Sequence, residues 1–309
     1  MVRHFLSLND FSKQELNAIL ALAVSLRQSY QQGGIDAVPP LYQQKGRNMA
    51  MIFQSPSTRT RVSFDIAMRQ LGGGTILLSP EDMQLGRGET IADTARVLSR
   101  YVDAIMIRIL DHEALYELAS HASVSVINGL TRYEHPCQIL ADVMTYQDYR
   151  GNVEGSVWSW FGPYNNVTRS LMHAARILGF ELRIACPHNM APSPEEIDAE
   201  RQKGGNIHIT QNADEAAFGA DCFVTDVWLS MGDEDNPALS KQLLPYQINE
   251  ALMAKAKQSA LFMHCLPAHR EKEVTSGVID GAQSVVFDEA ENRLHAQKAI
   301  LAWLLKNEA

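Results

Sequence analysis

Short apolar runs alternate with helix-like stretches along most of the chain, and this order restricts the folds that the sequence can adopt. In the first half, strands are predicted at 49–53, 75–78, 104–107 and 124–127, with helices between them at 58–70, 90–101 and 111–121. A capping-box pattern at Ser12 and Glu15 predicts a long helix before the first strand. This alternation indicates parallel strands, because parallel neighbours need a crossover connection that is usually a helix.

The second half of the chain repeats this architecture. Strands are predicted at 157–161, 182–185, 207–210, 222–225, 261–263 and 285–287, and helices at 136–150, 165–179, 194–203 and 289–305. We therefore predict an α/β fold with two doubly wound parallel-sheet domains joined by long helices, and a C-terminal helix that packs back on the N-terminal domain. The expected boundaries are 1–140 for the first domain, 141–288 for the second and 289–309 for the C-terminal helix.

Charge and cysteine content exclude several classes of partner. The chain of 309 residues has a formal net charge of −9 and no basic run, so we expect no nucleic-acid partner. It has neither a long apolar segment nor the pattern of a signal peptide, so we expect a cytoplasmic protein with no membrane partner. Its cysteines are widely spaced and lack a zinc-ligand pattern, which indicates free thiols and no metal site.

Residues 57–61 read Ser-Thr-Arg-Thr-Arg and stand where a predicted strand leads into a predicted helix. A helix N-terminus offers unpaired backbone N–H groups and the positive end of its dipole, and arginine adds planar donors that match phosphate oxygens. The segment therefore predicts a binding site for a dianion, with a phosphate-bearing ligand as the first hypothesis. The alternative is a helix cap followed by surface arginines, although a cap needs only one hydroxyl.

Further polar residues follow the other predicted strands of the first half. Arg108 comes directly after one strand, and His135 and Gln138 stand at the start of the helix that follows another. In doubly wound sheets, ligands bind beyond the carboxyl ends of the strands, so these side chains are expected to lie near Arg59. Together they could hold a small phosphorylated carbonyl compound. Taken alone, His135 could equally be a structural histidine.

The second half offers polar groups at comparable positions. Asn166 opens a predicted helix after one strand, and Asp226 follows another. An amide and a carboxylate at neighbouring strand ends suit the amino and carboxylate groups of an amino acid, although Asp226 alone could cap a helix. Cys265 follows a third strand and could be a nucleophile or a binding residue. Arg293 could hold a carboxylate or carbamoyl oxygen, or pair with an acidic neighbour.

With these residues in order, the chain resembles the aspartate/ornithine carbamoyltransferase family over essentially its whole length. The matching segments are 57–61, 83–89, 135–138, 226–232, 264–267 and 289–293. The segments 57–61 and 135–138 are common to both branches of the family. The segments 230–232 and 264–267, which read Ser-Met-Gly and His-Cys-Leu-Pro, are specific to its ornithine branch.

The resemblance implies transfer of a carbamoyl group from carbamoyl phosphate to the δ-amine of L-ornithine, giving citrulline and phosphate in arginine metabolism, without a metal or organic cofactor. The carbamoyl phosphate-binding residues that it implies are Ser57, Thr58, Arg59, Thr60, Gln84, Arg108, His135, Gln138, Cys265, Leu266 and Arg293. The implied ornithine-binding residues are Asn166, Asp226, Ser230 and Met231. Family members are commonly trimers or assemblies of trimers, in which the loop bearing Gln84 reaches a neighbouring subunit.

The implied catalytic residues divide by role. Arg59, Arg108 and His135 would stabilise negative charge on the carbonyl oxygen and the leaving phosphate. A primary amine has a pKa of about 10.4, so the enzyme must select or generate its neutral form. Asp226 and Cys265 are the candidates for orienting this amine or relaying its proton, and the sequence does not choose between them.

The chain departs from the family pattern beside these positions. Gln54 and Ser55 replace an acidic residue and a lysine, and Arg132 replaces a common aspartate. Residues 162–166 read Gly-Pro-Tyr-Asn-Asn where the family has Gly-Asp-Gly-Asn-Asn, which predicts a stiffer and larger turn next to Asn166. Two alternatives therefore remain: a carbamoyltransferase for another amine or amino acid, and a catalytically silent protein that binds carbamoyl phosphate. A nucleotide-binding Rossmann protein is disfavoured because no GxGxxG motif follows the first strand of either half.

Overall fold

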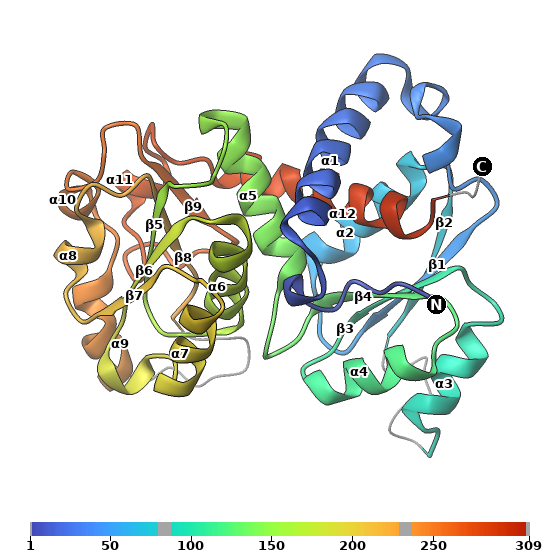
Figure 1. Cartoon of the computed structure of the whole chain (residues 1–309), viewed down its shortest axis with the longest axis horizontal. Helices are drawn as coiled ribbons and strands as arrows, with labels where there is room; N and C mark the ends of the chain where they lie inside the picture. Colours follow the sequence, from blue (N-terminus) through green and yellow to red (C-terminus); the bar gives the residue numbers. More distant parts are fainter. Residues whose placement is uncertain (1, 80–87, 229–236, 307–309) are drawn as a thin grey trace. The chain divides into compact units, whose positions relative to one another are not determined.

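The computed structural model describes residues 2–79, 88–228 and 237–306 (Figure 1). The chain forms two compact units. Unit 1 comprises Met1–Ala141 and Glu291–Ala309, and unit 2 comprises Asp142–Ala290. The boundaries fall inside two long helices, α5 (Pro136–Arg150) and α12 (Val286–Leu304). The part of α12 from Glu291 onward therefore belongs to the N-terminal unit.

The described residues of unit 1 form a parallel sheet with the strand order β2-β1-β3-β4. The strands are β1 (Asn48–Phe53), β2 (Gly74–Leu78), β3 (Ala104–Arg108) and β4 (Ser125–Leu130). The helices of this unit are α1 (Lys13–Gly33), α2 (Thr58–Gln70), α3 (Ile91–Leu98) and α4 (His112–His121), with short 3₁₀ turns at Leu8–Asp10, Gly34–Ala37 and Pro40–Tyr42. The predicted capping box is confirmed, because the Ser12 hydroxyl accepts from the Glu15 N–H and the Glu15 carboxylate accepts from the Ser12 N–H.

The described residues of unit 2 form a second parallel sheet with the order β7-β6-β5-β8-β9. The strands are β5 (Val157–Phe161), β6 (Glu181–Ala185), β7 (Ile207–Thr210), β8 (Cys222–Thr225) and β9 (Leu261–His264). The helices are α6 (Asn166–Leu178), α7 (Pro194–Gln202), α8 (Ala213–Ala217), α9 (Pro237–Leu243), α10 (Glu250–Met253) and α11 (Ser276–Ile279), with 3₁₀ turns at His188–Met190 and Leu244–Tyr246. The prediction of an α/β fold with two parallel sheets is confirmed.

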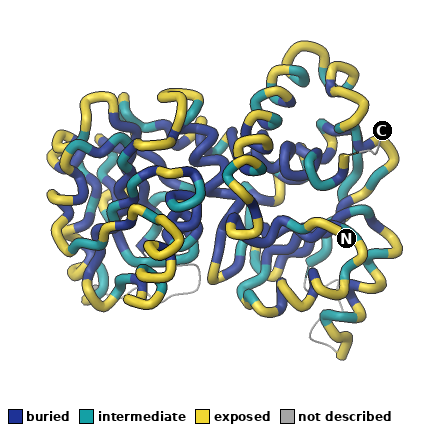
Figure 2. The backbone as a smooth tube through the Cα atoms, viewed as in Figure 1, coloured by how far each residue is buried: buried dark blue, intermediate teal, exposed yellow. Residues whose placement is uncertain are grey.

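Each sheet contributes apolar side chains to a core of its own unit. In unit 2, Phe161, Phe223 and Phe262 are fully buried, and the rings of Phe161 and Phe223 lie 4.6 Å apart. Figure 2 shows buried backbone along most of the strands and exposed backbone on the outer surfaces of the helices and loops. Burial of such aromatic side chains contributes about 1.5 to 3 kcal/mol each to folding. These cores hold the strand ends in fixed positions.

The predicted strand at 285–287 is wrong, because α12 already begins at Val286. Only Ser284 bridges to β9, opposite Phe262, and the Glu289 N–H then donates to the Val285 carbonyl, which is a helical bond. Asp288 and Glu289 in the first turn favour a helix start at this point, since acidic residues interact well with the positive end of the helix dipole. The local acidic residues therefore outweigh the strand propensity of two adjacent valines.

The strand orders identify where a ligand should bind. In unit 1 the chain runs outward from β1 in both directions of the sheet, so the order switches between β1 and β3. In unit 2 the corresponding switch lies between β5 and β8. Ligands of open α/β sheets bind outside the carboxyl ends of the strands at these switch points. Among the described residues, no helix is long and apolar enough to cross a membrane.

A buried lysine in unit 1 is expected to make stability depend on pH. Lys298 of α12 is fully buried, its Nζ donates to Gln70 Oε1 at 2.8 Å, and burial followed by the charge of Arg27 lowers its pKa from 10.5 to about 8. Between these two pH values the unfolded chain holds a proton that the folded protein has released, so a rise in pH stabilises the folded state. Urea titrations should show stability rising across this range relative to Lys298→Met.

The exposed Lys45 of the same unit supplies the control. A Lys45→Met variant should keep the wild-type dependence on pH. Parallel stability curves for the wild type and Lys298→Met across this range would contradict the expectation.

Candidate functional site

The junction between β1 and α2 presents the segment 57–61. Ser57 occupies the N-cap position with extended backbone angles, φ −155° and ψ 103°, but its side chain makes no capping hydrogen bond. The interpretation of this hydroxyl as a helix cap is therefore wrong. The helix N-terminus keeps its capacity to bind an anion. Thr58 is exposed, Ser57 and Arg59 are half-buried, and Thr60 is buried.

Thr60 belongs to a hydrogen-bonded group of four predicted residues. Its Oγ1 accepts hydrogen bonds from Arg108 Nη1 at 3.3 Å and from Arg293 Nη2 at 2.8 Å. Arg293 also donates through Nη1 to Gln138 Oε1. Thr60, Arg108, Gln138 and Arg293 come from α2, β3, α5 and α12, and all four are buried within unit 1. The fold thus places two guanidinium groups beside the N-terminus of α2, which makes this strand end suited to a dianion.

His135 lies directly before α5 and is also buried. Burial, followed by the positive charges of Arg293 and Arg108, lowers the pKa of His135 well below its usual value. The imidazole is therefore neutral at physiological pH. A neutral imidazole carries one N–H donor, which can bond to a carbonyl oxygen without adding a proton to the site.

Gln54 and Arg132, two departures from the family pattern, have structural contacts around Arg108. Gln54 Oε1 accepts from the Leu110 N–H at 2.8 Å, and its own N–H donates to the Arg108 carbonyl at 2.9 Å. The Arg132 N–H donates to the Leu110 carbonyl at 3.1 Å. These bonds join the ends of β1, β3 and β4. The Gln54 side chain contributes to this junction through Oε1, whereas the Arg132 bond is made by the backbone.

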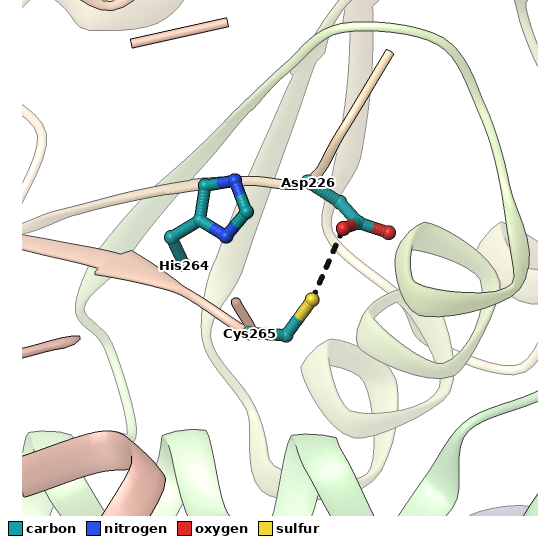
Figure 3. A group of neighbouring side chains, drawn as sticks. All are labelled: Asp226, His264 and Cys265. Atoms are coloured by element: carbon teal, nitrogen blue, oxygen red, sulfur yellow. Dashed lines mark hydrogen bonds between the residues drawn. The ribbon is translucent and has the colours of Figure 1, made fainter. Parts of the chain in front are cut away.

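In unit 2, Asp226 follows β8 and accepts hydrogen bonds at both carboxylate oxygens. Asn165 Nδ2 donates to Oδ2 at 3.1 Å, and the Val227 N–H donates to Oδ1 at 2.8 Å. Cys265 Sγ donates to Oδ1 at 3.1 Å, and Figure 3 shows the thiol pointing at the carboxylate. A strand-end carboxylate with this many donors is held in one orientation, which suits it to bind a cationic ligand.

Cys265 is not a thiolate in this arrangement. Burial, followed by the charge and hydrogen bond of Asp226, raises the pKa of the Cys265 thiol well above its usual value. A thiol at physiological pH is a donor and a poor nucleophile. The sequence hypothesis of a nucleophilic cysteine therefore has no support in the geometry, and the hypothesis of a binding residue is consistent with it.

His264 does not activate Cys265. Its Nδ1 accepts from the Leu266 N–H at 2.9 Å, and its Nε2 lies 3.3 Å from Glu273 Oε1. Potential ligand atoms of Asp226, His264 and Cys265 lie within 4.8 Å of one another, the spacing of a possible metal site. However, both ring nitrogens of His264 are already engaged, so a metal ion would have to break one of these bonds. Leu266 follows with a φ of 54°, in the left-handed region that residues other than glycine adopt infrequently.

The protonated thiol leads to a measurable expectation for alkylation. Cys265 is expected to react with iodoacetamide at least tenfold more slowly than a free cysteine at pH 8, because only the thiolate reacts. Asp226→Asn should accelerate alkylation, since it removes the negative charge that opposes ionisation. Peptide mass spectrometry would follow the reaction. Alkylation of wild-type Cys265 at the rate of a free cysteine would contradict this interpretation.

One predicted residue has the expected place, and others lie outside the described part of the chain. Asn166 is the first residue of α6 and is half-buried. Gln84, Ser230 and Met231 lie outside the described residues. Sequence reasoning missed Asn165, which binds Asp226 and caps α6. The signal was present, since asparagine is a strongly preferred N-cap residue, but two adjacent asparagines do not reveal which one faces the site.

Comparisons with known proteins agree with these observations. Residues 3–148 match the family described as "Aspartate/ornithine carbamoyltransferase, carbamoyl-P binding domain", and residues 154–304 match "Aspartate/ornithine carbamoyltransferase, Asp/Orn binding domain". An ornithine carbamoyltransferase of Nitrobacter winogradskyi is 58% identical over 98% of this chain and 97% of its own length.

Solved structures give the same result. The ornithine carbamoyltransferase of Pyrococcus furiosus has a TM-score of 0.91 and 46% identity, covering 97% of this chain and 96% of that one. The enzyme of Burkholderia thailandensis has a TM-score of 0.89 and 42% identity, covering 98% of this chain and 99% of that one.

Proposed function

Because the chain belongs to the aspartate/ornithine carbamoyltransferase family, we propose that it transfers the carbamoyl group of carbamoyl phosphate to the δ-amine of L-ornithine. The products are L-citrulline and phosphate, in arginine metabolism. The observation that carries the proposal is the group formed by Thr60, Arg108, Gln138 and Arg293 at the switch point of a parallel sheet, in a chain 58% identical to a named ornithine carbamoyltransferase.

Unit 1 supplies the groups for carbamoyl phosphate. The phosphate binds at the N-terminus of α2, where Ser57, Thr58 and Arg59 meet the positive end of the helix dipole. Arg108 and neutral His135 donate hydrogen bonds to the carbonyl oxygen and stabilise the negative charge that develops there. Gln138 and Arg293 help to fix the orientation of the bound carbamoyl phosphate. Every one of these groups is a donor, which suits a dianionic substrate and a dianionic leaving group.

Unit 2 supplies the groups for ornithine. The Asp226 carboxylate, held by its own donors, binds a cationic amino group of the amino acid, and Asn166 lies at the start of the adjacent helix. Cys265 carries its proton and points at Asp226, so it orients the carboxylate and does not take a proton from the amine. Of the two relay candidates, Asp226 is therefore the one that contacts the substrate amine. The reaction needs no metal in this account, because the donors carry the charge stabilisation.

A citrulline assay on the purified protein tests the proposal. We expect turnover with carbamoyl phosphate and ornithine, and little or none with acetylornithine, putrescine or aspartate as the acceptor. Turnover preferring one of the other acceptors would move the protein to a different carbamoyltransferase specificity. Tight binding of carbamoyl phosphate by calorimetry without turnover on any acceptor would indicate a silent family member.

We also propose that the protein is a cytoplasmic homotrimer or an assembly of trimers, as is common in the family. Supporting features lie in unit 1, where α2 exposes Val62 and Ile66 at 54% and 36% and the edge strand β2 exposes Ile76 at 47%. Val62 and Ile66 are four residues apart, so they share one helix face. An exposed apolar surface on an edge strand and its neighbouring helix suits contact with a second copy of the chain.

Charged substitutions on this surface should therefore dissociate the assembly. Val62→Glu combined with Ile76→Glu is expected to shift the sedimentation profile from trimer to monomer at micromolar concentration, because each buries a charge in an apolar contact. Phe218→Glu alters an apolar residue of unit 2 that is more exposed, at 76%, and should leave the assembly intact. An unchanged trimer in the double variant would place the interface elsewhere.

A further inference from the structure

The turn between β5 and α6 is joined to α7 through three side chains. Tyr164 Oη donates to Glu196 Oε1 at 3.3 Å, and Arg169 Nε donates to the same oxygen at 3.0 Å. The guanidinium carbon of Arg169 lies 5.0 Å from the centre of the Tyr164 ring, within the range of a cation–π contact. The Tyr164 side chain therefore connects the start of α6 to the first turn of α7.

Glu196 has a fixed orientation because its second carboxylate oxygen, Oε2, accepts a hydrogen bond at the N-terminus of α7. Its Oε2 accepts from the Ser193 N–H at 3.3 Å, and its own N–H donates to Ser193 Oγ at 3.2 Å, which completes a capping box. The Tyr164 N–H also donates to the Met190 carbonyl at 2.9 Å. Both the backbone and the side chain of Tyr164 are thus anchored to the segment that leads into α7.

The next residue, Asn165, connects the anchored turn to Asp226 through a hydrogen bond to its carboxylate. Its Oδ1 accepts from the Val167 N–H and the Thr168 N–H, each at 3.0 Å, which caps α6. Because the amide oxygen faces the helix, the amide nitrogen must face the other way, and Nδ2 donates to Asp226 Oδ2 at 3.1 Å. A displaced turn would therefore release one of the donors that orient Asp226.

We propose that Tyr164 and Glu196 are positioning residues for ornithine: they hold the turn so that Asn165 can orient Asp226. The proposal rests on the proposed function, since it takes Asp226 as a ligand of ornithine. It also gives a role to Tyr164, which stands where the family has a glycine. A tyrosine at this position adds a ring and a hydroxyl to the turn, and the bonds to Glu196 and Met190 fix the turn in one place.

Two conservative variants test the proposal. Tyr164→Phe removes only the hydroxyl and keeps the ring under Arg169. Glu196→Gln removes the charge and keeps a side chain that can complete the capping box. Each variant is expected to raise the KM for ornithine about threefold to tenfold, because one charge-assisted hydrogen bond weakens. The kcat should change less than about twofold, and the KM for carbamoyl phosphate should not change. The double variant should have the same KM for ornithine as Glu196→Gln, because both changes weaken the same contact between Tyr164 and Glu196.

Glu200→Gln provides the matched control. Glu200 pairs with Arg176 Nε at 2.7 Å, so a second ion pair joins the same two helices about one turn further along α7 and about two turns further along α6. This variant should lower the thermal midpoint as much as Glu196→Gln does and leave the KM for ornithine unchanged. If Tyr164→Phe and Glu196→Gln behave in the same way as Glu200→Gln, the cluster is only a structural contact and the proposal fails.

Amide hydrogen exchange supplies a readout that needs no turnover. Exchange at Val167 and Thr168 should become faster in Tyr164→Phe and Glu196→Gln and stay at the wild-type rate in Glu200→Gln, because only the first two loosen the cap on α6. Unchanged exchange in all three variants would overturn the positioning role. Absence of citrulline formation by the wild type would contradict the proposed function, and the exchange comparison would still decide the positioning role.

Discussion

Replacement of Asp226 by asparagine is expected to lower kcat/KM for ornithine about a thousandfold. The variant has nearly the same shape but loses the negative charge that pairs with the substrate amine, and truncating a desolvated charge pair costs about 2 to 5 kcal/mol. It also places an amide N–H₂ group among the donors of Asn165, Val227 and Cys265, which leaves donor facing donor. Steady-state kinetics with ornithine as the varied substrate would measure the loss.

Asp221→Asn is the matched control for this change. Asp221 immediately precedes β8, at the opposite end from Asp226, where it accepts from the Val157 N–H at 2.9 Å and pairs with Lys257. Its replacement should reduce stability by about 1 kcal/mol and leave ornithine kinetics unchanged. Carbamoyl phosphate binding should be normal in both variants by calorimetry. An Asp226→Asn variant with wild-type ornithine kinetics would exclude Asp226 from the substrate site.

Replacement of Arg108 by methionine is expected to lower kcat/KM for carbamoyl phosphate about a thousandfold. Methionine fills a similar volume in a buried position, while the change removes a guanidinium group that meets Arg293 at the Thr60 hydroxyl. Loss of one donor aimed at developing negative charge costs about 2.7 to 4 kcal/mol in comparable sites. Most of the loss should appear in kcat if Arg108 acts on the carbonyl oxygen, since that charge grows in the transition state.

Arg27→Met controls for the loss of a positive charge from the same unit. Arg27 on α1 donates through Nη1 to Asn292 Oδ1 at 3.0 Å, one residue before Arg293. This variant should keep kcat/KM for both substrates within about threefold of the wild type, because Arg27 does not join the bonds around Thr60. An equal loss of kcat/KM in Arg27→Met and Arg108→Met would mean that the effect comes from net charge, and it would contradict the role assigned to Arg108.

The pattern of apolar runs predicted most of the strands because buried parallel strands read as continuous apolar segments. β5, β7 and β8 have the predicted ends. The error at 285–287 arose because two adjacent valines have strand propensity, whereas the acidic residues after them favour a helix N-terminus. Strand propensity therefore does not predict the conformation of this segment, because the sheet holds it through a single bridge at Ser284.

Site residues at the carboxyl ends of strands were easier to predict than the contacts among their side chains. Arg108 is the last residue of β3 and Asp226 follows β8 directly, and a doubly wound sheet brings such positions to one edge. The contacts among side chains were not predictable. Nothing in the local sequence indicates that Arg293 would reach Thr60 across 233 positions of the chain, or that Asn165 rather than Asn166 would hold Asp226.

The sequence by itself determined the alternation of strands and helices, the family and the residue types at each strand end. Those depend on periodicity, propensity and motifs that are local along the chain. The tertiary structure alone decided that Cys265 keeps its proton, that His135 loses one and that Tyr164 is anchored to Glu196. Protonation and orientation depend on burial and on charges from distant segments, and these exist only once the chain has folded.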